Sequence, residues 1–439
     1  MVGIILALAA LIILCVKKIH IVIASLIATL IVCIFNGMNF YGELTGNYIN
    51  GFGSFVMSWF LVFFAGAFFG KMMDVSGSAQ SIANALIKAV GPKYALVAVP
   101  IAIGLLCYGG VNGFVVVFAV WPMMDRIFRQ LDKPRRLMPA WFQFGAGTFS
   151  NCAPGTPSSL NLVTTGALGV GPAAGFGIGM VAAAVNLVLG IALGMLLFKK
   201  ADARGEHYLA PGAVDYSYDD QAKLNEEKKV PNVIIALLPL VVTVVSLNIT
   251  LGGVQIVNNF YAILLGTIVC AVLNYKTIGF DKFVSGLGES VTGGLGIVSA
   301  TAAVTGFATV IKATAAFQGV IDSIPNMPGN PLFTLFLATN VMCAITGTAT
   351  GAASIVAPIL GDIYLKMGIP AATIARTIVV SGVGFDSVPH NGAIVNYIFG
   401  FARENYKSAY PAVFLLTVVV PCIAALACVA AAYIFGVAG

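Results

Sequence analysis

Long stretches of this chain carry almost no charge, and this feature limits its possible folds more than any other. Of its 439 residues, 59% are hydrophobic and only 9% are charged, whereas soluble domains carry about 25% charged residues. Such a chain cannot expose most of its surface to water. We therefore expect an all-helical protein embedded in a membrane, which excludes secreted disulfide scaffolds, nucleic-acid binders and ordinary cytosolic enzymes.

Apolar segments of about 20 residues are long enough to cross a bilayer as helices. Segments near this length lie at residues 1–16, 19–35, 53–73, 172–198, 231–248, 257–273, 290–311 and 411–435, and two longer segments, 134–170 and 370–402, are interrupted by polar residues and Pro. Two further apolar stretches, 94–128 and 331–366, are broken in the middle by Gly-rich sequence. We interpret each of these two stretches as a re-entrant hairpin.

The distribution of basic residues agrees with the hairpins. If both hairpins return to their own side, 20 of the 23 Lys and Arg residues fall on one face, which the positive-inside rule assigns to the cytoplasm. The N-terminus is then outside. The distribution of basic residues is itself one reason for interpreting the two stretches as hairpins. It is therefore consistent with the hairpins but is not independent evidence for them. Arg135, Arg136 and Arg376 lie near expected helix ends, where snorkelling or orientation is the usual explanation.

The two halves of the chain resemble each other. A displacement of 236 or 237 residues aligns Gly110 with Gly347, Pro122 with Pro358, Asp125 with Asp362, Pro134 with Pro370, Gly145 with Gly382 and Gly147 with Gly384. Each copy contains about five crossings and one hairpin, so the second copy is expected to be inverted. We interpret residues 1–198 as the first repeat, 199–230 as a solvated cytoplasmic linker and 231–439 as the second repeat. Inverted repeats with interrupted helices are typical of secondary transporters.

Four breaks in helical sequence are the candidate binding elements. They are the hairpin tips at residues 109–113 and 346–351 and the interruptions at 150–159 and 384–392. Helix N-termini after a break offer N–H groups to an anion, and carbonyls near Gly347 and Gly384 are candidate Na⁺ ligands. The candidate substrate-binding residues are Gly109, Gly110, Asn112, Asn151, Thr156, Ser158, Ser159, Asn161, Thr346, Thr348, Thr350, Ser354, Ser387 and Asn391. For any single hydroxyl, a helix cap or a helix–helix hydrogen bond is the alternative.

Asp386 and His390 are the candidates for ion coupling. An acidic residue at membrane depth is costly and is usually functional, and a neutral His can bind a carboxylate or carry a proton. In the alternative interpretation, Asp386 only caps the following half-helix or pairs with His390. The breaks contain few fixed cations, which suits a small monocarboxylate or hydroxy acid better than a polyanion.

Five strings within these elements carry a resemblance to a known family. They are residues 108–118, 134–137, 153–157, 346–351 and, above all, 386–393. Through them, and over nearly its whole length, the chain resembles the gluconate permease family of the ion transporter superfamily, and more closely its branch of D-β-hydroxybutyrate permeases. The resemblance implies transport of gluconate-like or short hydroxy-carboxylate anions driven by a proton or sodium gradient. It also implies a scaffold domain and a mobile transport domain that moves like an elevator, often in a dimer.

The leading hypothesis is a symporter, not an enzyme, that imports a small organic anion across the bacterial cytoplasmic membrane. We expect no cofactor other than the co-transported H⁺ or Na⁺, no nucleic-acid partner, and a homodimer. A cation/proton antiporter on a related fold is the alternative, but its core would need more carboxylates than Asp386 alone. The carried anion and the ion remain open, and His390 favours a proton.

Overall fold

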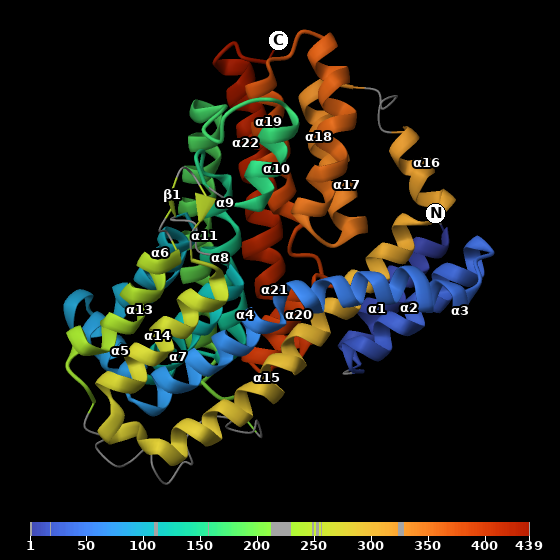
Figure 1. Ribbon diagram of the computed structural model, residues 1–439. Coiled ribbons are helices and arrows are strands. Elements are labelled where there is room, and N and C mark those ends of the chain that lie inside the picture. Colours follow the sequence, from blue (N-terminus) through green and yellow to red (C-terminus); the bar gives the residue numbers. More distant parts are fainter. Residues whose placement is uncertain are drawn as a thin grey trace.

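The computed structural model describes residues 2–17, 19–108, 113–156, 158–211, 230–247, 250–251, 254–255, 257–323 and 329–438, and these form a helical assembly (Figure 1). Four helical stretches, 40–75, 176–203, 275–312 and 406–434, are long and apolar enough to cross a membrane, and the bent pair 78–90 and 94–108 gives a fifth. Shorter apolar helices of 10–17 residues accompany them. The predicted class, a helical multi-pass membrane protein, is confirmed at this level.

The first half contains the following elements: α1 (Val2–Val16), α2 (Ile21–Asn36), α3 (Phe40–Glu43), the π-helix η1 (Leu44–Tyr48), α4 (Ile49–Val75), α5 (Ser78–Val90), α6 (Pro92–Tyr108), α7 (Gly113–Gln130), the 3₁₀-helix η2 (Arg135–Leu137), α8 (Met138–Gly147), α9 (Phe149–Cys152), α10 (Ser159–Ala167) and α11 (Phe176–Ala203). Helices α6 and α7 contact each other where the first hairpin is expected, and residues 109–112 between them lie outside the described residues. The expected interruption falls between α8 and α10.

The second half contains these elements: α13 (Val233–Leu247), the two-residue strands β1 (Thr250–Leu251) and β2 (Val254–Gln255), α14 (Asn259–Leu273), α15 (Tyr275–Lys312), α16 (Ala315–Ser323), α17 (Pro331–Thr346), α18 (Ala349–Lys366), α19 (Ala371–Phe385), α20 (Gly392–Val395), the π-helix η4 (Asn396–Phe401), α21 (Tyr406–Phe414), the π-helix η5 (Leu415–Val419) and α22 (Val420–Ile434). Helices α17 and α18 form the second hairpin, and residues 386–391 interrupt the helix that α19 begins.

Helices α4 and α15 pack against each other in opposite directions and make the most extensive contact between two helices of the described residues (Figure 1). A Cβ atom on Gly294 would lie 3.0 Å from the Cα of Phe64, and one on Gly286 would lie 2.6 Å from the Cε of Met72. Glycine is therefore required at 294 because the two backbones touch there. Helix α15 also contacts α2, and helix α4 also contacts α14.

Helix boundaries in the two halves correspond. Helix α7 begins at residue 113 and α18 begins at 349, 236 residues later, and both contain 18 residues. The same displacement brings α4 onto α15 and α5 onto α16, and the helices follow in the same order. Helices α5 and α16 are not among the expected spans because their sequences mix polar and apolar residues. Helix α15 begins at Tyr275 rather than near residue 290 because Gly286 lets its polar first half pack on α4.

The start of the expected linker is part of the folded structure. Helix α11 extends to Ala203, and the residues after it bind the loop between α7 and α8. Lys133 pairs with Asp202 at 2.6 Å, while Asp132 accepts hydrogen bonds from the His207 ring at 2.7 Å and from the Tyr208 amide at 2.9 Å. The expected linker therefore begins within α11 and contacts the α7–α8 loop, whereas residues 212–229 lie outside the described residues.

The bonds from His207 and the Tyr208 amide hold the pKa of the Asp132 carboxyl below its usual value. A carboxyl with a lowered pKa stabilises the folded state at neutral pH, and this contribution is lost as the pH falls through the lowered pKa. The contact between the linker and the α7–α8 loop is therefore present at neutral pH and weakens in acid.

The close approach of α4 and α15 can be tested by the direction in which Gly→Ala substitutions shift the melting temperature. We expect Gly294→Ala to lower the melting temperature of the detergent-purified protein, because the new methyl group meets the α4 backbone. In the same helix, Gly293→Ala and Gly296→Ala place Cβ atoms where no atom lies within 4 Å. These controls should leave the melting temperature unchanged or raise it, since Ala is favoured over Gly in helices by about 0.5–1 kcal/mol. Equal shifts for all three variants would contradict the close packing.

Candidate functional site

The side chain of Asn391 joins the second interruption, residues 386–391, to the tip of the second hairpin by hydrogen bonds. Its amide nitrogen donates to the carbonyl of Gly347 at 2.9 Å and to the carbonyl of Asp386 at 2.6 Å. Its amide oxygen accepts from the backbone amides of Ala393 and Ile394 and so caps the helix that follows the break. One buried side chain thus satisfies backbone groups on both sides of the break and on the hairpin, as a membrane interior requires.

Asp386 lies at the N-terminus of a hairpin helix. Its Oδ1 atom accepts a hydrogen bond of 2.7 Å from the backbone amide of Ala349, the first residue of α18. The partial positive charge of a helix N-terminus stabilises a carboxylate there. The alternative interpretation placed this cap on the following half-helix, but Asn391 caps that helix, and no hydrogen bond joins Asp386 to His390 among the described residues.

His390 is buried beside the hairpin tip, with 4% of its surface exposed. A Cβ atom on Gly347 would lie 3.2 Å from the Cδ2 atom of His390, so glycine at 347 makes room for the ring. Neither ring nitrogen has a hydrogen-bond partner in the described part of the chain, and the nearby carbonyl of Ala344 does not meet hydrogen-bond geometry. A buried polar group without a partner is costly, which makes this ring a candidate for binding a proton or a substrate oxygen.

The first interruption is built around Asn161. Its amide nitrogen donates to the carbonyls of Thr156 at 2.8 Å and Pro172 at 2.9 Å, and Ser158 caps α10 by accepting from the backbone amide of Asn161 at 3.3 Å. The Asn161 Oδ1 and Thr156 Oγ1 atoms are buried and have no partner among the described residues. This break therefore also contains polar oxygens that are free to accept a hydrogen bond or bind an ion.

Arg376 joins the two halves beneath these breaks. Its side chain is fully buried, with 0% exposed. It donates to the carbonyls of Ala174 at 3.0 and 2.8 Å, Pro172 at 2.9 Å and Cys152 at 3.5 Å. The expectation that Arg376 snorkels is wrong, because the loop between α10 and α11 folds over the guanidinium and solvates it with carbonyl oxygens. No carboxylate lies within 4.0 Å of it among the described residues.

Arg135 and Arg136 also differ from the snorkelling expectation. Arg135 is buried and pairs with Glu404 at 3.0 Å, and Arg136 pairs with Glu206 at 2.5 Å. Both arginines therefore hold segments of the protein together at this end of the bundle.

The second interruption makes further contacts with α8 and α21. Gln143 of α8 donates to the Ser387 hydroxyl at 3.2 Å. In α21, Tyr410 donates to the Ser387 carbonyl at 3.1 Å and Tyr406 donates to the Pro389 carbonyl at 2.5 Å. Gln143, Tyr406 and Tyr410 are absent from the candidates drawn from the sequence. Gln143 could have been found as a polar residue inside the apolar segment 138–147.

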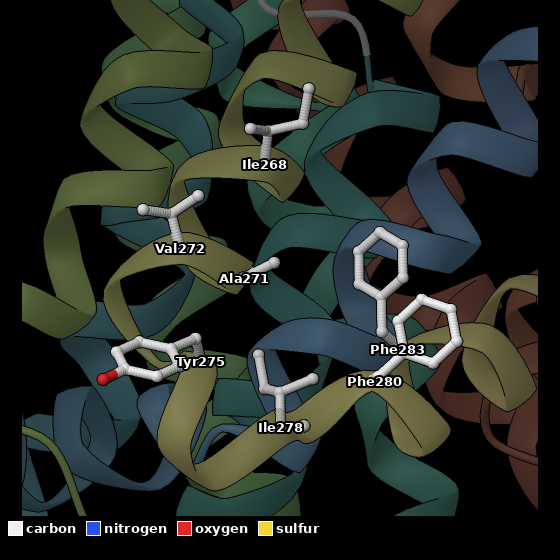
Figure 2. Close-up of a pocket in the computed structure, with 8 residues that line it drawn as sticks. Ile268, Ala271, Val272, Tyr275, Ile278, Phe280 and Phe283 are labelled. Atoms are coloured by element: carbon white, nitrogen blue, oxygen red, sulfur yellow. The ribbon is translucent and has the colours of Figure 1, made fainter.

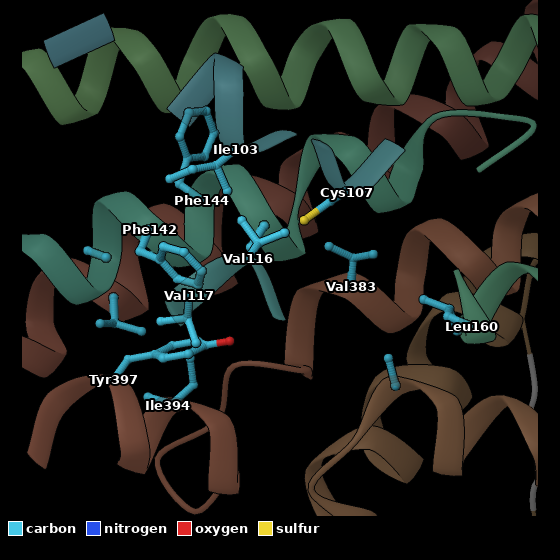
Figure 3. Packing of buried hydrophobic residues seen from close by; sticks show 14 of the residues in the cluster. Ile103, Cys107, Val116, Val117, Phe142, Phe144, Leu160, Val383, Ile394 and Tyr397 are labelled. Atoms are coloured by element: carbon cyan, nitrogen blue, oxygen red, sulfur yellow. The ribbon is translucent and has the colours of Figure 1, made fainter. Parts of the chain in front are cut away.

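Buried apolar side chains from both halves pack together in this part of the bundle, with Phe142 and Leu160 from the first half and Val383 and Tyr397 from the second (Figure 3). The rings of Phe142 and Tyr397 pack edge to face with their centroids 4.9 Å apart. Leu160 of α10 lies against α19, where a Cβ atom on Gly382 would be 3.5 Å from it. Since α10 belongs to the first half and α19 to the second, the two interruptions share one buried region.

The remaining candidates occupy varied places. Ser159, Thr348 and Ser354 are exposed, Asn151 and Thr350 are half-buried, and Thr346 is buried with its hydroxyl bonded to the carbonyls of Met342 and Thr348. Gly109, Gly110 and Asn112 lie outside the described residues, so the first hairpin tip is not placed. The Gly347 carbonyl already accepts from Asn391. Within the described ranges, no group of three His, Cys, Asp or Glu residues is arranged to hold a metal ion.

This combination defines a class of protein. A multi-pass helical membrane protein in which a hairpin tip and two interrupted helices meet at a buried polar region is a membrane transporter. Residues 1–390 match the family described as GntP family permease, and the chain belongs to this family. The resemblance to gluconate permeases drawn from the sequence is confirmed at the level of the family.

Two curated proteins are similar over most of their length. An uncharacterized transporter of Bacillus subtilis, YxjC, is 26% identical over 404 residues, which cover 83% of this chain and 84% of that protein. An uncharacterized permease of Haemophilus influenzae is 24% identical over 373 residues, or 79% of this chain and 75% of that protein. Both names support membrane transport, and neither identifies a substrate.

The role of Arg376 can be tested by changing its shape without its charge. We expect Arg376→Lys to lower the melting temperature markedly, because an ammonium group cannot reproduce the planar fork that reaches three carbonyls, and hydrogen bonds to charged groups contribute about 1.5–3 kcal/mol each. Arg204→Lys is the matched control, since the Arg204 side chain is 70% exposed. A melting temperature for Arg376→Lys equal to that of the control would show that the loop does not depend on the guanidinium.

Proposed function

We propose that this permease is a symporter that imports a small organic anion together with a proton. The observation that carries the proposal is the arrangement of Asp386 and His390 at the hairpin tip. The carboxylate accepts a hydrogen bond from the first residue of α18, and the buried imidazole beside it has no hydrogen-bond partner among the described residues. A proton and an anion could both be recognised there, with Asp386 and His390 handling the coupling ion.

The polar groups of this region favour a short hydroxy-carboxylate or gluconate-like acid. The N-termini of α10 and α18 offer backbone amides and the hydroxyls of Ser158 and Thr348, which suit one carboxylate and neighbouring hydroxyl groups. Arg376 is already bonded to carbonyls. A substrate with several negative charges would require cations that the described region does not supply. The narrower assignment to hydroxybutyrate remains a prediction from the resemblance.

The proposed mechanism is alternating access by two inverted repeats. The boundaries of α7 and α18 support it, since the helices are equal in length and 236 residues apart, as does the antiparallel packing of the corresponding helices α4 and α15. We propose that α4 and α15, with α1, α2, α13 and α14, form a scaffold along which the hairpins and interrupted helices move as an elevator. We further propose a homodimer in the bacterial cytoplasmic membrane, with the N-terminus outside.

The charge of Asp386 can be removed while its cap is retained. We expect Asp386→Asn to abolish gradient-driven accumulation of substrate in proteoliposomes, because an amide oxygen can still accept from the Ala349 amide but carries no charge. Its melting temperature should stay close to that of the wild type. Asp281→Asn, an exposed position in α15, controls for the loss of one negative charge. Full accumulation by Asp386→Asn would refute the coupling role.

The coupling ion can be separated from the substrate by the choice of gradient. We expect uptake of a short hydroxy acid into proteoliposomes to follow an imposed inward proton gradient in buffers free of Na⁺, since Asp386 and His390 at the hairpin tip are both groups that can bind a proton. His390→Gln should lose the response to the proton gradient. Strict dependence on Na⁺ would instead assign His390 to substrate contact, and Na⁺ would then be the coupled ion.

A further inference from the structure

A pocket lies at the turn between α14 and α15 (Figure 2). None of the residues that line it belongs to the breaks described above. Its volume is about 390 Å³, within the range of ligand-binding cavities. Ile268 and Val272 line it from α14, and Tyr275 and Phe280 line it from α15. Val272 is 64% exposed and Phe280 is 81% exposed, so the pocket opens onto a surface that a membrane protein presents to lipid.

The pocket results from a fixed bend in the backbone. Gly279 has φ 66° and ψ 169°, a conformation that residues with side chains rarely adopt, and it separates the first turn of α15 from the rest of the helix. Beyond the bend, Phe283 packs against Phe68 of α4 with ring centroids 5.1 Å apart. The helix is thereby held on α4, and the hollow beside α14 is part of the fold.

Charged groups stand at the rim of this apolar pocket. The Lys276 ammonium lies 5.9 Å from the centroid of the Tyr275 ring, and the Lys282 ammonium donates to the carbonyl of Thr277 at 3.2 Å. Both lysines are exposed, as is Asp281, which follows the bend at Gly279. Two ammonium groups and one carboxylate leave one net positive charge. Further along α15, Glu289 is neutralised by Lys71 at 2.9 Å.

We propose that this pocket binds an anionic glycerophospholipid, with an acyl chain in the hollow and the phosphate on Lys276 and Lys282. An apolar hollow bordered by basic residues matches both parts of such a molecule, and basic pockets between membrane helices are known to bind anionic headgroups. A second copy of the chain fits less well. A two-fold contact through this surface would bring the same lysines of the two copies together, and like charges repel.

The test is native mass spectrometry of the full-length protein in detergent, titrated with phosphatidylglycerol or phosphatidylethanolamine of identical acyl chains. We expect wild-type protein to retain phosphatidylglycerol at least about fivefold better, the effect of about one lysine near an anionic surface. The double variant Lys276→Gln/Lys282→Gln should lose this preference. Lys199→Gln/Lys200→Gln removes the same charge from exposed positions in α11 and should retain it.

A second variant tests the hollow itself. Ala271→Trp places an indole in the pocket that Ala271 lines and should reduce retention of both lipids. Equal retention of the two lipids by the wild type, or an unchanged preference in the Lys276→Gln/Lys282→Gln variant, would overturn the proposal. So would a lipid-free dimer that Ala271→Trp converts to a monomer, because a second copy would then occupy the surface. None of these outcomes depends on transport activity.

Discussion

Unpaired backbone groups in a membrane determine how this structure is built. Lipid offers no hydrogen bonds, so each residue that leaves the helix must find its partners within the protein. At the second break, the Asn391 side chain bonds four backbone groups: the carbonyls of Gly347 and Asp386 and two amides at the start of α20. At the first break, Asn161 and Arg376 both bond the Pro172 carbonyl. These few polar side chains allow the helices to stop inside the bundle.

The sequence was sufficient to predict the class of fold and the position of the breaks. Apolar runs and Gly-rich interruptions are local signals, and the second hairpin and both interrupted helices lie where these signals predict them. Helices α5 and α16 were missed for a physical reason. Their sequences are neither long nor apolar. Helix α5 folds because neighbouring helices bury one of its faces, which includes Ala79, Ile82 and Ala83. Local composition does not contain that information.

Which residues contact one another could be predicted less well. Asp386 was identified from its cost at membrane depth and Asn391 from its place in a helix break, yet the partner of each lies on the hairpin, 37 and 44 residues away. Arg376 was misplaced because an arginine near a helix end usually reaches water. Here a loop from the other half, more than 200 residues earlier, covers it and contributes the carbonyls. Such long-range contacts leave no pattern in the neighbouring sequence.

Arg376 and Asp386, the two charged groups beside the breaks, are both stabilised by backbone groups. The Arg376 cation is surrounded by carbonyl oxygens, and the Asp386 carboxylate accepts from a helix N-terminus. Neither is held by an opposite charge in a described ion pair. A buried salt bridge would have to break, at a cost of several kcal/mol, before either partner could change its charge or position. Backbone dipoles stabilise a charge without that constraint, since they stay in place when a carboxylate becomes protonated. The proposed coupling role of Asp386 fits this arrangement, because a change in its charge would leave the hydrogen bonds of the surrounding helices in place.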